Sequence, residues 1–138
     1  MDRTIDITSK DRERLLKLIE EEKEFGKGRN KDHLRDLEQE LNRANIVPSE
    51  KIPADSITMN SQVLLKDMES GEETIYTLVY PEDVNLAENK ISVLAPIGTA
   101  ILGFRVGDII SWKVPVGTVK LRVEKILYQP EAAGDYDL

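Results

Sequence analysis

The stretch "EEEKEFGKGRNKD", Glu20 to Asp32, decides the architecture of the N-terminal part of the chain. Mostly apolar residues recur with 3, 4, 3 spacing in 15–25, which overlaps the start of this stretch, and in 34–44, which follows it. This spacing indicates two amphipathic helices. Gly26 and Gly28 interrupt the pattern because glycine adopts positive φ angles without a steric penalty. We therefore predict an antiparallel hairpin of two helices, each of about 15 residues and about 22 Å, joined by a turn of about five residues.

Four glutamates in this stretch raise the question of a metal site: Glu20, Glu21, Glu22 and Glu24. Successive residues of a helix point about 100° apart, so Glu20 and Glu24 share a face while the other two do not. Several lysines and arginines lie close by in the sequence and partly neutralise the carboxylates. A solvated helix face with ion pairs across the hairpin is the favoured interpretation, and a magnesium site is the alternative.

The helical hairpin is predicted to occupy residues 1–47, with Thr8 as the N-cap of its first helix and Asp11 at the capping-box position. The following segment, 48–56, contains proline and lacks a periodic apolar pattern, so it is predicted to be a linker. Residues 57–138 then form the C-terminal domain.

Beyond the linker the sequence changes from helical to strand periodicity. Two pairs of β-rich runs are predicted to form hairpins, one across "SGEE" and one across 115–117. "KISVL" is a short strand, and "PIGTAILG" suits a short helix that begins at Pro96 and ends at Gly103. The order strand, strand, strand, helix, strand, strand predicts an α+β domain: an antiparallel sheet with one short helix packed on it and one face exposed to water.

Composition excludes several classes of function. The 138 residues contain no cysteine and a single histidine, His33, which excludes disulfides, thiolate nucleophiles and clusters of histidine ligands. The net charge of -7 argues against binding of nucleic acid through phosphate neutralisation. No apolar run approaches the roughly 20 residues of a membrane span, and the N-terminal segment lacks the features of a secretory signal. We expect a monomeric cytoplasmic protein without a cofactor.

The residues form no pattern typical of catalysis. His33 has no neighbouring arrangement that would make a nucleophilic triad, and "LGFRVGD" lacks the glycine spacing of a phosphate-binding loop. We expect no catalytic residue, no metal site and no enzyme activity. A highly charged hairpin with a basic tip, joined to an acidic domain, is typical of a module that docks into another macromolecule.

Several stretches of the C-terminal part resemble a known family: "TMNSQVLL", "TLVYPED", "ISVLAPIGTAILGFRVGD" and "YQPEAAGDYDL". They are similar to the Rnk family, the regulators of nucleoside diphosphate kinase, within the Gre-type bacterial transcription factors, and the resemblance extends across 41–138. It implies an N-terminal coiled-coil hairpin and a C-terminal domain with an FKBP-like fold. It also implies binding at the rim of the secondary channel of RNA polymerase, with the hairpin pointing inward, and no specific binding of DNA.

The tip of the hairpin distinguishes between relatives. Gre factors carry acidic residues there, which help the polymerase magnesium to cleave a backtracked transcript. The turn here, Gly26–Asn30, contains the basic residues Lys27 and Arg29 and no carboxylate; the nearest acids are Glu24 and Asp32. The resemblance thus implies competition with Gre factors without cleavage. A Gre-like cleavage factor and a general protein-interaction module that self-associates through its leucines remain the alternatives.

The segment "LAPIG" is similar to the loop with which Gre factors contact the polymerase rim. The resemblance makes Leu94, Ala95, Pro96 and Ile97 candidates for polymerase binding, although Leu94 and Ala95 stand where Gre factors often have polar residues. Exposed Leu94 and Pro96 are also compatible with another protein partner. An FKBP-like fold also suggests prolyl isomerase activity. The 5% aromatic content disfavours this function, because the reaction needs an aromatic-lined pocket.

Overall fold

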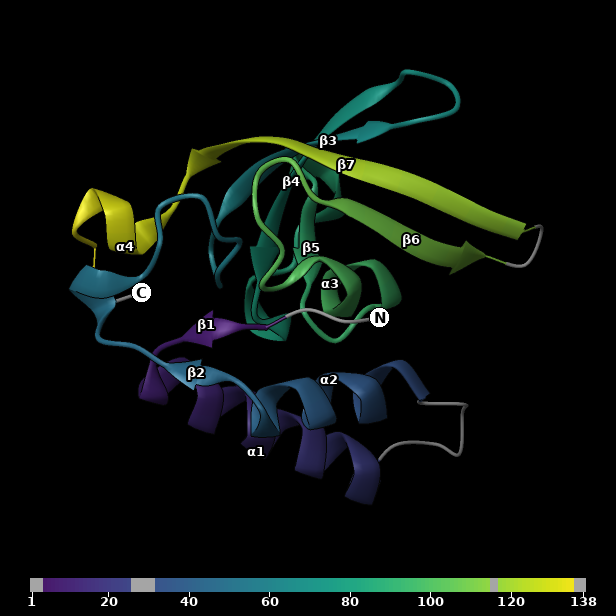
Figure 1. The fold of residues 1–138 in the computed structure, drawn as a ribbon. Coiled ribbons are helices and arrows are strands. Elements are labelled where there is room, and N and C mark those ends of the chain that lie inside the picture. The colour runs from purple at the N-terminus through teal and green to yellow at the C-terminus, as the bar shows by residue number, and fades with distance from the viewer. Residues whose placement is uncertain (1–3, 26–31, 115–116, 136–138) are drawn as a thin grey trace.

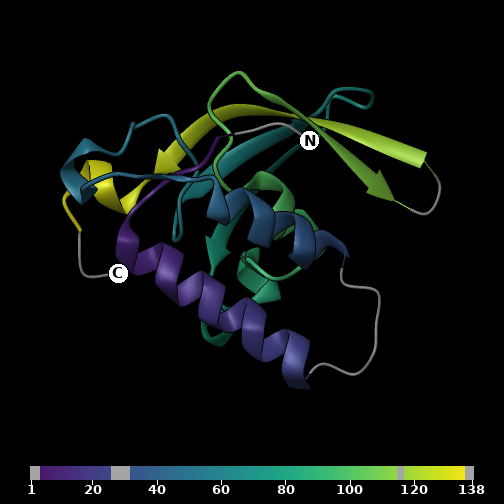
Figure 2. The ribbon, with the colours of Figure 1, turned by 60° about the horizontal axis from the view of Figure 1, so that its bottom comes forward.

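The structure is a computed structural model that describes residues 4–25, 32–114 and 117–135. Its N-terminal part contains the two predicted helices, α1 (Ser9–Phe25) and α2 (Asp32–Asn42), which pack against each other (Figures 1 and 2). The backbone N–H of Asp11 donates to Oγ1 of Thr8 at 3.2 Å, as expected of an N-cap. The helical hairpin is confirmed, with an α1 of 17 residues and a shorter α2 of 11 residues.

A two-stranded parallel sheet closes the base of the hairpin. β1 (Asp6–Ile7) precedes α1, and β2 (Asn45–Ile46) follows α2. The backbone N–H of Asn45 donates to the carbonyl oxygen of Ile5 at 2.8 Å. Strands of two residues leave no periodic pattern, so this sheet had no signal in the sequence.

The C-terminal part is built on a five-stranded sheet with strand order β5-β4-β3-β7-β6. Its strands are β3 (Gln62–Asp67), β4 (Glu73–Val79), β5 (Lys90–Ser92), β6 (Ile109–Val114) and β7 (Gly117–Tyr128). The two predicted hairpins, β3–β4 and β6–β7, are confirmed by their antiparallel pairing. Of the turn predicted across 115–117, residues 115 and 116 lie outside the described residues, and Gly117 is the first residue of β7.

The sheet is mixed rather than wholly antiparallel, because β5 pairs parallel to β4. Two short 3-10 turns, η2 (Pro81–Asp83) and η3 (Leu86–Glu88), lie in the connection between these strands. They carry the chain back along β4 before β5 begins, and such a return is what a parallel neighbour requires.

The helical hairpin shares one hydrophobic core with the C-terminal part. The predicted short helix, α3 (Pro96–Ile101), is confirmed and packs on one face of the sheet, and the hairpin lies on that same side (Figure 1). The buried cluster includes residues of the hairpin, of α3 and of the sheet: Leu15, Ile19, Leu34, Leu37, Leu41, Ile101, Val63, Leu78 and Val123. Each such side chain contributes about 1.5–3 kcal/mol when fully buried. The hairpin is therefore fixed against the sheet and α3, while the division at 48–56 remains a prediction.

The C-terminal segment forms a further helix that the sequence did not predict, α4 (Pro130–Ala133). The side chain of Gln129 caps it, since its Oε1 accepts from the N–H of Ala132 at 3.2 Å. Gly134 ends the helix with a φ of 81°, a left-handed conformation that favours glycine. α4 contacts the 3-10 turn η1 (Ser49–Lys51), so the tail packs on the predicted linker. Among the described helices, none is long and apolar enough to cross a membrane.

Candidate functional site

The predicted binding loop, Leu94–Ile97, comprises the end of the connection from β5 to α3 and the first two residues of α3. Pro96 stands at the start of α3, where its missing N–H costs no hydrogen bond. Ser92 anchors the loop, because its Oγ accepts from the N–H of Leu94 at 3.0 Å and its carbonyl oxygen accepts from that of Ala95 at 3.1 Å. Pro96 is exposed, and the other three residues are half-buried. The structure thus brings all four predicted residues into one anchored loop with Pro96 outermost.

Gly98 sets how closely α3 approaches the sheet. A Cβ atom at this buried position would lie 2.0 Å from the carbonyl oxygen of Ser92, a distance that no side chain tolerates. Only glycine therefore allows the first turn of α3 to lie directly on the end of β5. The contact fixes the orientation of the loop relative to the sheet.

A groove of about 240 Å³ lies between α3 and the sheet, next to this loop. Its lining residues come from α3, from strands β3, β4 and β7, and from the β3–β4 turn: Ile97, Leu65, Asp67, Glu72, Thr74, Tyr76, Val119 and Leu121. The groove combines aliphatic side chains with two carboxylates. It is suited to receive an aliphatic or basic side chain of a partner protein.

The predicted arm tip is described only in part. Glu24 lies exposed in the last turn of α1, and Asp32 is the first residue of α2. Lys27, Arg29 and the side chain of Asp32 lie outside the described residues. The role predicted for these four residues at the tip of the hairpin therefore remains a prediction.

The acidic stretch of α1 forms an ion pair across the hairpin, as predicted. Nζ of Lys23 lies 2.5 Å from Oε1 of Glu38 on α2. Within the described ranges, no group of three or more histidine, aspartate and glutamate side chains is arranged to hold a metal ion.

A buried hydrogen bond that the sequence did not indicate joins the root of the hairpin to the sheet. The Tyr80 hydroxyl donates to Oδ1 of Asp11 at 2.8 Å, and both residues are buried, with exposed fractions of 1% and 7%. Burial raises the pKa of the Asp11 carboxyl, and the hydrogen bond from Tyr80 opposes that rise. Burial and the neighbouring Asp11 carboxylate together raise the pKa of the Tyr80 hydroxyl, which therefore remains a neutral donor.

Arg14 strengthens this junction, and Arg12 joins the two helices of the hairpin. The Arg14 guanidinium lies 3.6 Å from the centre of the Tyr80 ring and pairs with Glu82 in η2. Nε of Arg12 donates to the carbonyl oxygen of Leu41 at 2.9 Å, which binds the start of α1 to the end of α2. The position of the hairpin relative to the sheet is thus set by polar contacts as well as by the core.

Hydrogen bonds explain how the described part of the tail "QPEAAGDYDL", Gln129–Leu138, is held in place. Nε2 of Gln129 donates to the carbonyl oxygens of Pro53 at 2.8 Å and Ser56 at 2.6 Å. Oε1 of Glu131 accepts from the Thr58 hydroxyl at 2.7 Å, and burial raises the pKa of the Glu131 carboxyl. The tail therefore fastens the predicted linker to the end of the sheet, which no local sequence signal could reveal.

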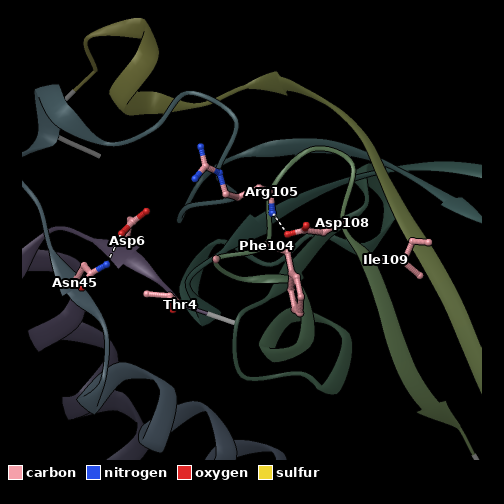
Figure 3. A pocket seen from close by; sticks show the side chains of 8 residues that line it. Thr4, Asp6, Asn45, Phe104, Arg105, Asp108 and Ile109 are labelled. Atoms are coloured by element: carbon pink, nitrogen blue, oxygen red, sulfur yellow. Dashed lines mark hydrogen bonds between the residues drawn. The ribbon is translucent and has the colours of Figure 1, made fainter. Parts of the chain in front are cut away.

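A wider pocket of about 550 Å³ lies between the base of the hairpin and the C-terminal part (Figure 3). Asp6 and Asn45 contribute to it from the two-stranded sheet, and Asp6 accepts a hydrogen bond from Nδ2 of Asn45 at 3.1 Å. On its other side, the backbone N–H of Arg105 donates to Asp108 at 2.8 Å, and the Arg105 guanidinium pairs with Asp55 at 2.7 Å. These polar groups bind one another on each side of the pocket, so they stabilise its walls.

The family model described as "Transcription elongation factor, GreA/GreB, C-term" matches residues 52–128, and the model described as "Rnk N-terminus" matches residues 3–47. Together the two matches span the helical hairpin and the five-stranded sheet. The chain therefore belongs to the family of GreA/GreB-type transcription elongation factors, as its C-terminal match covers more than half of it.

Within that family, the N-terminal match relates the chain to the Rnk proteins. It is 46% identical over 101 residues to "Regulator of nucleoside diphosphate kinase" from Escherichia coli K12, which covers 72% of this chain and 74% of that protein. It is 37% identical over 90 residues to "Transcription elongation factor GreA" from Syntrophomonas wolfei, which covers 65% of this chain and 57% of that protein. A solved GreA/GreB factor from Nitrosomonas europaea has a TM-score of 0.75 and 42% identity, with coverage of 92% of this chain and 100% of the other.

Proposed function

We propose that this protein binds RNA polymerase at the rim of the secondary channel and competes there with Gre factors without stimulating transcript cleavage. Family membership supports the broader part of this statement, that the protein is a regulator of the transcription elongation factor type. The proposal requires neither a cofactor nor membrane binding, and it places the protein in the cytoplasm as a monomer.

The observation that carries the proposal is the anchored loop Leu94–Ile97. Ser92 and Gly98 hold it against the end of β5, so it does not need to be ordered when a partner binds. Pro96 projects from it, and Ile97 leads into the groove of mixed aliphatic and acidic character. Such a fixed apolar projection beside a groove suits docking on the surface of a large protein.

The hairpin supports competition rather than cleavage. Its helices of 17 and 11 residues correspond to about 25 Å and about 16 Å. The intervening turn, Gly26–Asn30, contains no carboxylate in the sequence. A cleavage factor has to deliver carboxylates to the polymerase magnesium, because acidic oxygens are the ligands that this ion prefers. A short hairpin with a basic turn would occupy the channel without supplying them.

Binding is tested by competition between this protein and a Gre factor for core RNA polymerase. We expect Pro96→Asp to weaken competition by about tenfold, because it places a charge at the centre of an apolar contact. Pro81→Asp is the matched control, since Pro81 is likewise an exposed proline at the start of a short helix. Failure of the wild-type protein to compete at saturating concentration would refute the proposed site.

Cleavage is tested separately with backtracked polymerase complexes. We expect no transcript shortening above the intrinsic rate of the polymerase. Shortening that is abolished by Glu24→Ala or Asp32→Ala would instead establish the alternative, a Gre-like cleavage factor. Concentration-dependent dimers in light scattering, combined with no affinity for polymerase, would favour a general interaction module.

A further inference from the structure

The face of the sheet that points away from α3 and the hairpin carries an unusual set of side chains. The strand register identifies them, because directly paired residues share a face. Lys66 pairs with Glu73 on one side and with Arg122 on the other, and Leu64 pairs with Ile75 and Lys125 in the same way. Lys120, two residues before Arg122 on β7, lies on this face as well. We call these seven residues the outer face.

The outer face is basic on a protein that is acidic. It carries four cations, Lys66, Lys120, Arg122 and Lys125, while the chain as a whole has a net charge of -7. Its acidic groups are Glu73 and a neighbour, Glu124, whose Oε1 lies 4.0 Å from Nη1 of Arg122. Among the described residues, Arg122 forms an ion pair with Glu124, and the separation of 4.0 Å makes this pair weak.

The centre of the outer face is aliphatic. Ile75 is 42% exposed, and its partner Leu64 is half-buried beside it. The cations lie beside this pair on β3 and β7, while Glu73 lies next to Ile75 on β4. The aliphatic stems of the cations extend the apolar area while their charged ends reach solvent. An exposed aliphatic patch beside a cluster of cations is typical of an interaction surface.

This surface is separate from the proposed polymerase site. Ile97 packs into the groove formed by the inner residues Leu65, Tyr76 and Leu121, so the loop before α3 belongs to the opposite side of the sheet. Figure 1 shows the same arrangement, with α3 and the hairpin below the sheet and the other face of β3 and β7 uncovered. Both surfaces can therefore be occupied at the same time.

We propose that the outer face binds a protein segment in which acidic and aliphatic residues alternate. Such a segment would place carboxylates against Lys66, Arg122 and Lys125 and its aliphatic side chains against Leu64 and Ile75. A nucleic acid fits less well, because its phosphate backbone would meet the cations but would offer no aliphatic group to the aliphatic centre.

The experiment uses the full chain and labelled octapeptides in which Asp or Glu alternates with Leu, Val or Ile. A second set replaces the aliphatic residues by serine, and a single-stranded DNA of equal charge is the third probe. We expect the first set to bind about tenfold more tightly than either of the others at low ionic strength. Lys66→Glu with Arg122→Glu should reduce that binding by about tenfold. Lys17→Glu with Lys51→Glu is the matched control, since both lysines are exposed elsewhere and the net charge changes equally.

Three results would each overturn the proposal: no binding of any acidic-aliphatic peptide, tighter binding of the DNA, or equal binding by the charge-reversed variant and its control. If charge reversal impairs folding, Lys66→Gln with Arg122→Gln and the single change Ile75→Ser provide the same comparison. Because the outer face lies opposite the loop, the variants should still compete with a Gre factor for polymerase, so a failure here leaves the proposed function unaffected.

Discussion

Removal of one hydroxyl at the root of the hairpin tests how its position is maintained. Tyr80→Phe leaves the ring in the core and beneath the Arg14 guanidinium, but it removes the donor that contacts Asp11 at 2.8 Å. The Asp11 carboxylate is only 7% exposed, so water cannot easily replace the lost partner. The change therefore isolates a single buried, charge-assisted hydrogen bond.

A hydrogen bond to a buried charged group contributes about 1.5–3 kcal/mol, and we expect Tyr80→Phe to lower the free energy of unfolding by about 2 kcal/mol at neutral pH. For a chain of this length, that loss corresponds to a decrease in Tm of about 7 °C. When Asp11 is protonated at low pH the bond joins neutral groups, so the loss should fall to about 1 kcal/mol.

Urea unfolding at neutral and acidic pH measures both values. Tyr76→Phe is the control, because Tyr76 is a half-buried tyrosine in β4, the strand that ends just before Tyr80, and its effect should stay within about 0.5 kcal/mol. Equal effects of the two substitutions at neutral pH would refute the reasoning that the Asp11 contact holds the hairpin in place.

Three further substitutions test the junction, the loop and the tail. Asp11→Asn keeps an acceptor for Tyr80 and removes a charge whose ionisation weakens folding as the pH rises through its raised pKa. The free energy of unfolding of the Asp11→Asn variant, minus that of the wild type, should therefore be greater at neutral pH than below about pH 4. A difference that does not change with pH in urea unfolding would contradict this expectation. Gly98→Ala should cost about 1–3 kcal/mol in the same assay, because the added methyl meets the backbone of Ser92; an unchanged midpoint would be inconsistent with the close contact. Gln129→Ala leaves the buried carbonyl oxygen of Ser56 without this donor, and we expect a loss of about 1–3 kcal/mol and faster proteolysis within 48–56, which an intact digestion pattern would disprove.

Local patterns in the sequence were sufficient for α1, α2 and α3 and for the two hairpins of the sheet, but not for the short strands β1 and β2 or for α4. The 3, 4, 3 spacing around Glu20–Asp32 predicted α1 and α2, and Pro96 predicted the start of α3. Runs of β-forming residues on either side of turn signals predicted the β3–β4 and β6–β7 hairpins. Each of these signals depends only on residues that are close together in the sequence. At that range, the spacing of apolar residues is enough to show which face of a helix or strand is apolar.

Contacts between distant residues had no such signal. Asp11 was expected only to begin a helix, yet its carboxylate meets Tyr80, 69 positions further along the chain. The parallel pairing of β5 with β4 and the fastening of the tail by Gln129 depend in the same way on how whole elements are placed. For the candidate site, the sequence identified the loop residues, and the structure added the contact of Gly98 with Ser92 that fixes them.

Composition and spacing are properties of the chain alone, so they were enough to predict the main helices and the two sheet hairpins, the family resemblance and the basic residues between the two helices. The shared core of the hairpin and the sheet, and the gathering of cations from β3 and β7 on one face, depend on tertiary packing. Strand register brings those cations together, and it is set by long-range packing rather than by any local stretch of sequence.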